Sequence, residues 1–159
     1  MGSILIAYAS KTGTARDAAE RIARLLPDSD LVDLTADKPI LENYQAAIIG
    51  GGVRMGSVHK DTKRFIDANV KKLLGIKAAY FITNSFVDSV ERILDKMLPA
   101  ELKHHAVFIG SLGGRMDIKN LKGLDKAIAN MVSKAVDDGQ QVANELDEEA
   151  LHDLVSRFE

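Results

Sequence analysis

Short apolar segments alternate with segments of helical period along this chain, and the alternation limits the possible folds more than any other feature of the sequence. The first apolar run, ILIAYA, is unbroken, as expected for a strand buried on both faces of a sheet. We predict five strands, at residues 4–9, 30–34, 46–52, 78–85 and 106–112. Helices are predicted between them, at residues 13–26, 62–74 and 87–98. This order joins parallel strands by right-handed crossovers and predicts an α/β, doubly wound, five-stranded parallel sheet with helices on both faces.

The C-terminal region is longer than one closing helix requires. Apolar residues recur at helical spacing and predict an extra helix near residues 120–136. The segment LDEEA then begins a last helix, with acidic residues in the first turn, where the helix dipole favours them. The sequence contains no linker, repeat or low-complexity segment, so residues 1–159 are expected to form a single domain.

Composition excludes several classes of function. The chain has 159 residues, a net charge of −2 and no cysteine. The charge gives no basic field for nucleic acid. The lack of cysteine excludes disulfides, thiolate metal sites, iron–sulfur clusters and thiol redox chemistry, and no metal site is predicted. The apolar N-terminus is too short for a membrane span or a secretory signal, so a cytoplasmic location is expected.

The junction SKTGTA, between the first strand and the first helix, carries the strongest functional signal. In a doubly wound sheet, ligands bind beyond the carboxyl ends of the strands, and this junction lies there. A helix N-terminus offers unpaired N–H groups that suit a phosphate. Gly13 allows close approach of the backbone, while Ser10, Thr12 and Thr14 add hydroxyl groups. Ordinary N-capping is the alternative, but it needs only one hydroxyl.

Three other α/β sites match the sequence poorly. A Walker A loop ends in Gly-Lys-Ser/Thr, whereas here Lys11 precedes Gly13. A dinucleotide fingerprint needs three glycines in the first turn, and only Gly13 is present, although Asp33 stands at a suitable distance for a ribose-binding acid. A phospho-acceptor receiver domain needs acidic residues where this chain has Ser10 and Gly50.

The junction resembles the phosphate loop of the flavodoxin family, Thr/Ser-x-Thr-Gly-x-Thr. Thr14 stands where that family often has asparagine, and Ala15 replaces the last threonine. The resemblance extends along the whole chain and implies a strand order of 2-1-3-4-5 and flavin mononucleotide (FMN) as the cofactor. It implies that the phosphate is bound by Ser10, Lys11, Thr12, Gly13, Thr14 and Ala15.

Three further loops correspond to those that hold the isoalloxazine ring in that family. The implied ring-binding residues are Gly52, Val53, Arg54, Met55, Gly56, Asn84, Ser85, Phe86, Gly113 and Gly114. Met55 has a polarizable sulfur that can lie against a ring, and its peptide bond to Gly56 can turn a carbonyl toward flavin N5. Phe86 can stack on the ring. The alternative for Met55 and Phe86 is ordinary core packing.

The pattern is most similar to the flavodoxin-like menaquinone-dependent protoporphyrinogen dehydrogenases, because of the run IIGGGVRMGSVHKD and the inserted helix before the last one. In that family the insert is linked to quinone and membrane contact. The insert here carries Lys119, Lys122, Lys126 and Lys134, which indicate at most peripheral attraction to an anionic membrane. A solvated helix face is the simpler interpretation.

The sequence therefore leaves three functions open. The first is an FMN-dependent oxidoreductase that acts on a quinone, a porphyrinogen or a similar small redox molecule. The second is an electron carrier between redox partner proteins, and the third is a flavin-free phosphate-binding domain. No catalytic side chain is predicted, and Arg54, His59 and Arg115 are interpreted as surface or loop-bracing residues. The sequence does not indicate the oligomeric state.

Overall fold

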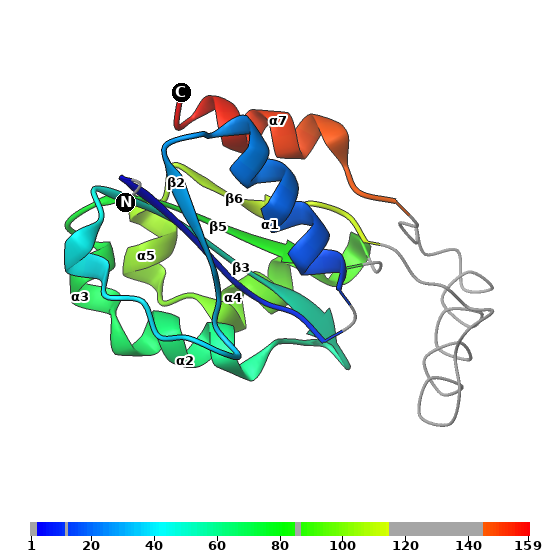
Figure 1. Cartoon of the computed structure of the whole chain (residues 1–159). Helices are drawn as coiled ribbons and strands as arrows, with labels where there is room; N and C mark the ends of the chain where they lie inside the picture. The colour runs from blue at the N-terminus through cyan, green and yellow to red at the C-terminus, as the bar shows by residue number, and fades with distance from the viewer. Residues whose placement is uncertain (1–2, 12, 85–86, 115–144) are drawn as a thin grey trace, which may run out of the picture.

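The computed structural model describes residues 3–11, 13–84, 87–114 and 145–159, which form a layered α/β structure (Figure 1). Its main sheet has the order β2-β1-β3-β5-β6, and all neighbouring pairs in that order are parallel. The strands are β1 (Ile4–Ala9), β2 (Ser29–Asp33), β3 (Ala46–Arg54), β5 (Lys77–Thr83) and β6 (Phe108–Ser111). The expected doubly wound sheet and its strand order are therefore confirmed.

A short hairpin extends the sheet beyond the expected end of β3. This strand was predicted to end at Gly52, but it continues to Arg54 and pairs antiparallel with β4 (Ser57–Val58). Two residues connect the pair, Met55 with φ 54° and Gly56 with φ 79°. Positive φ at both positions is typical of the type I′ turn that two-residue hairpins favour. Val53 and Val58 pack on the core at the base of the hairpin, which holds the hairpin in place.

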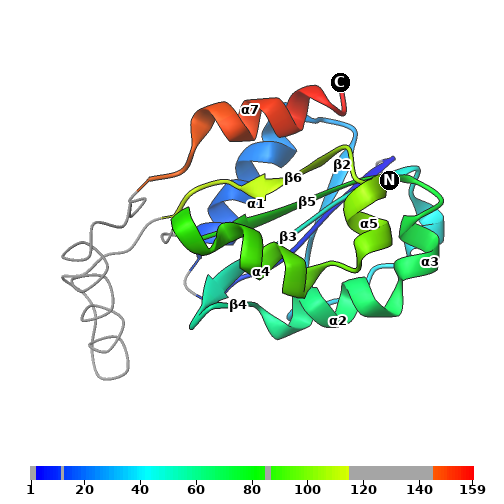
Figure 2. The same ribbon diagram turned by 180° about the vertical axis from the view of Figure 1, so that it is seen from behind.

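Helices cover both faces of the sheet (Figures 1 and 2). One face carries α1 (Thr14–Leu25) and α7 (Glu148–Ser156), which an ion pair between Arg21 and Glu148 joins. The other face carries α2 (Lys60–Ala68), α3 (Val70–Leu73), α4 (Val90–Met97) and α5 (Ala100–His105). Two short 3-10 turns occur at Leu41–Asn43 (η1) and Val87–Ser89 (η2).

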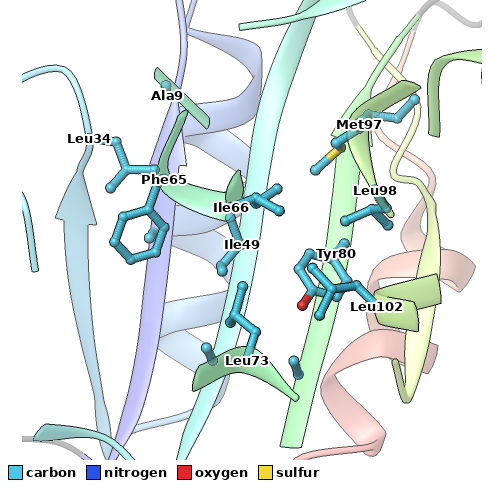
Figure 3. Close-up of a cluster of buried hydrophobic side chains, with 14 of the residues drawn as sticks. Ala9, Leu34, Ile49, Phe65, Ile66, Leu73, Tyr80, Met97, Leu98 and Leu102 are labelled. Carbon is cyan, nitrogen blue, oxygen red and sulfur yellow. The ribbon is translucent and has the colours of Figure 1, made fainter. Parts of the chain in front are cut away.

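Each face of the sheet has its own apolar core because successive strand residues point to opposite sides. On the face of α2 to α5, Ile49 and Tyr80 from the strands join Ile66, Met97 and Leu102 from the helices (Figure 3). The face of α1 and α7 is filled by Ile6, Tyr8, Ile22, Ile48, Phe81, Leu151 and Leu154. Unbroken apolar strands are thus explained by burial on both sides.

Tyr80 is fully buried in the first of these cores. Its hydroxyl is the buried side-chain atom that finds no hydrogen-bond partner in the described part of the chain. Burial raises the pKa of this phenol, so it stays protonated.

The helices differ from the sequence prediction in three places. The helix expected at 62–74 is two helices, α2 and α3, which Asn69 separates with φ −128° and ψ 19°. The helix expected at 87–98 begins with the turn η2. Helix α5 was not predicted; it begins directly after α4, with Pro99 as its N-cap residue. The expected extra helix at 120–136 and its lysines lie outside the described residues.

Candidate functional site

The carboxyl ends of the parallel strands meet at one edge of the sheet, and the first turn of α1 lies at the same edge (Figures 1 and 2). The distances around Gly52 show how close the strand ends and the first turn of α1 are to one another. A Cβ placed on Gly52 would lie 3.7 Å from Thr83 Oγ1, 4.0 Å from Ala15 Cβ and 4.0 Å from Ser10 Oγ. The ends of β1, β3 and β5 and the start of α1 therefore meet around Gly52.

Three of the residues that meet here, Ser10, Ala15 and Gly52, are among those implied by the family resemblance. The fourth, Thr83, was missed. It is the last residue of β5 and stands directly opposite Gly52 in the sheet register. The available signal was a threonine at the carboxyl end of an otherwise apolar strand, and such a residue fits ordinary strand propensity equally well.

The loop between β1 and α1 is closed by Ser10. Its Oγ accepts a hydrogen bond from the Gly13 N–H at 2.9 Å, which leaves the hydroxyl proton available to a ligand. Gly13 is the N-cap of α1 with φ 94°, and no side chain among the described residues caps this helix. A Cβ on Gly13 would meet nothing within 4 Å, so this side of the loop is open. Lys11 is exposed, Thr14 is half-buried, and Thr12 lies outside the described residues.

An open helix N-terminus of this kind suits an anion. The first N–H groups of a helix lack partners within the helix and carry positive partial charge. The backbone at Gly13 can approach a ligand because there is no side chain in the way. The arrangement can hold a phosphate through main-chain N–H groups and the hydroxyls of Ser10 and Thr14.

The three glycines at the end of β3 have different roles. A Cβ on Gly50 would lie 2.2 Å from the Phe81 ring, and one on Gly51 would lie 2.5 Å from Thr62 Oγ1. Gly50 and Gly51 therefore make room for side chains of the core. A Cβ on Gly52 would make only ordinary van der Waals contacts, at 3.7 Å and beyond, with residues at the carboxyl edge.

The hairpin after Gly52 presents Met55 to solvent. The side chain of Met55 is 66% exposed, so the core-packing interpretation is wrong for this residue. Val53 packs partly on the core, and Arg54 stands opposite Ser57 in the hairpin. A methionine with positive φ is uncommon, since this region favours glycine and asparagine. Strain of this kind is often kept where the exposed side chain has a role.

His59 braces the end of the hairpin. Its backbone N–H donates to the Gly52 carbonyl at 2.9 Å. Its Nδ1 accepts from the Asp61 N–H at 3.1 Å and so caps α2. The loop-bracing interpretation is therefore confirmed for His59.

The loops after β5 and β6 are joined to each other. Asn84 is 6% exposed; its N–H donates to the Gly113 carbonyl at 2.9 Å, and its Nδ2 donates to Ser89 Oγ at 3.3 Å. Gly113 has φ 79°, and a Cβ there would lie 2.4 Å from the Glu145 carbonyl oxygen. The Gly114 N–H donates to the same carbonyl at 3.1 Å. Gly113 and Gly114 thus hold the returning chain against the edge. Ser85 and Phe86 lie outside the described residues.

Asp33, the candidate ribose-binding acid, is engaged locally. One oxygen of its carboxylate accepts from the Thr35 N–H at 2.9 Å and from the Thr35 hydroxyl at 2.7 Å. This is an Asx-turn, which removes support from the dinucleotide interpretation. Burial raises the pKa of the nearby Tyr8 phenol, and the negative charge of Asp33 adds to the effect.

No group of three or more His, Cys, Asp or Glu residues suited to a metal ion occurs in the described part of the chain. None of the described helices is long and apolar enough to cross a membrane.

A family model described as a flavodoxin domain matches residues 5–143. The chain belongs to the flavodoxin family. Flavodoxin 1 from Bacillus cereus has a similar structure, with a TM-score of 0.55 and 18% identity over 82% of this chain and 97% of that chain. A Fusobacterium nucleatum flavodoxin bound to flavin mononucleotide gives a TM-score of 0.52 and 15% identity over 99% and 97% of the two chains.

This flavodoxin also resembles part of a larger protein. Rubredoxin oxygen:oxidoreductase from Desulfovibrio gigas gives a TM-score of 0.51 and 13% identity, and the match covers 85% of this chain but 36% of that chain. At these identities the solved structures establish the flavodoxin fold. A comparison with curated proteins finds no match.

Proposed function

We propose that this flavodoxin binds FMN at the carboxyl edge of its sheet and transfers electrons through it. The observation that carries the proposal is the open start of α1 at Gly13, in a loop whose sequence resembles the family's phosphate loop. The Fusobacterium nucleatum flavodoxin, which has the same fold, is bound to FMN. In our proposal the phosphate lies against the loop of Ser10, Lys11, Thr12, Gly13, Thr14 and Ala15.

The ring is proposed to lie between the loops that follow β3, β5 and β6. The proposed contacts are Gly52, Val53, Arg54, Met55, Gly56, Asn84, Ser85, Phe86, Gly113 and Gly114. The exposed thioether of Met55 supports this placement, because a polarizable apolar group at the edge of a site gains from contact with an aromatic ring. When bound, the flavin supplies the redox chemistry, and the protein binds and orients it.

We propose further that the physiological reaction oxidises or reduces a small flat molecule such as a quinone or porphyrinogen. The net charge of −2 supports this choice over a carrier, because carriers that steer onto basic partner proteins usually have a strong acidic field. The resemblance of the run from Ile48 to Asp61 to menaquinone-dependent protoporphyrinogen dehydrogenases supports it as well. The proposed setting is the cytoplasm, with at most peripheral membrane contact.

Two measurements, made one after the other, test the proposal. The apoprotein is titrated with FMN and with riboflavin while flavin fluorescence is followed; tight binding of FMN and much weaker binding of riboflavin are expected. The loaded protein is then given protoporphyrinogen with a menaquinone analogue, and in parallel a flavodoxin reductase. Turnover of the small substrates supports the enzyme, and reduction by the reductase alone supports the electron carrier. A protein that binds no FMN would leave only the flavin-free domain.

A further inference from the structure

Two threonines are buried among the residues that the structure describes, and their hydroxyls have different surroundings. Thr62 is fully buried and donates a hydrogen bond to the Gly50 carbonyl at 2.9 Å. Thr83 is 4% exposed, and its hydroxyl makes no hydrogen bond with any of the described residues. The Thr83 oxygen is not among the fully enclosed side-chain atoms that lack a partner, so the small exposed part of this residue includes its hydroxyl.

The position of Thr83 in the fold indicates a role for its hydroxyl. It is the last residue of β5, at the carboxyl edge, and it points to the same face of the sheet as Phe81, two residues earlier. Phe81 closes the apolar core over Gly50, and the next position on that face is a threonine rather than another apolar residue. The polar surface of the site therefore begins at Thr83.

The neighbours of Thr83 indicate what it faces. Its Oγ1 and the Oγ of Ser10 both lie within 4.0 Å of the point where a Cβ of Gly52 would stand. Ala15, in the first turn of α1, borders the same point. These neighbours belong to the proposed phosphate loop, whereas the ring-binding candidate Met55 lies beyond, at the hairpin tip.

A valine would fill the position of Thr83 equally well and would have no polar group to bury. The surroundings of the Thr83 hydroxyl differ from those of the Tyr80 hydroxyl. The Tyr80 hydroxyl also lacks a partner, but it lies within the apolar core on the opposite face of the sheet. Thr83 lies instead at the carboxyl edge, beside Gly52 and near Ser10 at the start of the β1–α1 loop. We propose that Thr83 is a ligand-binding residue whose hydroxyl, together with that of Ser10, donates a hydrogen bond to the phosphate of FMN. This inference rests on the proposed function.

The test compares Thr83→Val with Thr62→Val, which removes the hydroxyl that already has a protein partner. Apoproteins are melted thermally and titrated with FMN and riboflavin. Thr83→Val is expected to keep the melting temperature and to raise the Kd for FMN by about tenfold, since a hydrogen bond to a charged group is lost. Its Kd for riboflavin, which lacks the phosphate, should not change. Thr83→Ser should restore FMN binding.

Thr62→Val is expected to lower the melting temperature and to leave the ratio of the two Kd values as in the unmodified protein. Unchanged FMN affinity in Thr83→Val, or an equal loss for FMN and riboflavin, would overturn the assignment to the phosphate while the proposed function stands. Should Thr83→Val melt at a lower temperature, Thr83→Ala and Thr83→Ser decide by the same ratio. Failure of the unmodified protein to bind FMN would refute both proposals together.

Discussion

Gly51 and Gly52, at the end of β3, can be substituted in turn to test whether the first is needed for stability and the second for FMN binding. A methyl group on Gly51 would lie 2.5 Å from Thr62 Oγ1 and 2.9 Å from Val58 Cγ2, distances that require Thr62 to move. Such a move breaks the buried hydrogen bond from Thr62 to the Gly50 carbonyl. At Gly52 the nearest atom would be 3.7 Å away, which is ordinary contact. Gly51→Ala should therefore damage the fold, and Gly52→Ala should not.

The size of the effect follows from the two terms. Loss of the buried hydrogen bond costs about 1–3 kcal/mol, and overpacking adds about 1–3 kcal/mol. Gly51→Ala should thus lower the free energy of unfolding by about 3 kcal/mol and the melting temperature by about 10 °C. Gly52→Ala should change stability by less than about 1 kcal/mol, since the lower entropy of the unfolded chain offsets small adjustments.

Urea unfolding of the apoproteins measures both effects. Gly51→Ala is then repeated in a Thr62→Ala background, where the clashing oxygen is gone and the cost should fall by at least about 1 kcal/mol. Titration with FMN completes the experiment. Gly52→Ala should bind FMN at least about tenfold more weakly, because the methyl group would stand between Ser10 and Thr83, where the phosphate is proposed to bind. Equal stability losses at the two glycines, or native FMN affinity in Gly52→Ala, would refute this reasoning.

Three further changes test other parts of the structure. Gly13→Val should weaken FMN binding at least about tenfold and affect riboflavin binding less, because the valine side chain blocks the approach of the backbone to the phosphate and is strained at φ 94°. The same affinity for FMN in Gly13→Val and in the unmodified protein would contradict the assignment of this loop to the phosphate. Tyr80→Phe should raise the free energy of unfolding by about 1 kcal/mol, since an unpaired buried hydroxyl is removed. Its control, Tyr44→Phe, should lower that free energy by about 1 kcal/mol, since the Tyr44 hydroxyl donates to Asp30 at 2.9 Å. A lower free energy of unfolding in both variants would contradict the prediction for Tyr80→Phe. Met55→Asn should stabilise the hairpin by about 0.5–1 kcal/mol, as asparagine adopts positive φ readily, and should weaken FMN binding; a variant that melts earlier would argue against strain at the turn.

Much of the fold could be predicted from local patterns. The run ILIAYA had the length and apolar character of a doubly buried strand, and it forms β1 with the expected bounds. The glycine and hydroxyls that follow predicted a helix start with an open N-terminus, and Gly13 is that N-cap. These features depend on residues close together in the chain, so their chemistry can be read in one dimension.

The errors arose where the deciding neighbour is distant in sequence. The three consecutive glycines cannot be distinguished in the sequence. In the fold, Phe81 lies against Gly50 and Thr62 against Gly51, whereas Gly52 lies at the carboxyl edge of the sheet. The hairpin to β4 was missed because Val53 and Val58 are held by packing on the core and not by a strand pattern of their own.

By itself, then, the sequence determined the alternation of elements, the parallel sheet and the start of α1 at Gly13, because periodicity and caps are local properties. Only the tertiary structure decided which glycines pack against the core, that Met55 is exposed, and that Thr83 and Ser10 both lie near Gly52. Those decisions depend on distances between atoms of separate strands, and such distances exist only once the sheet has formed and the helices have packed on it.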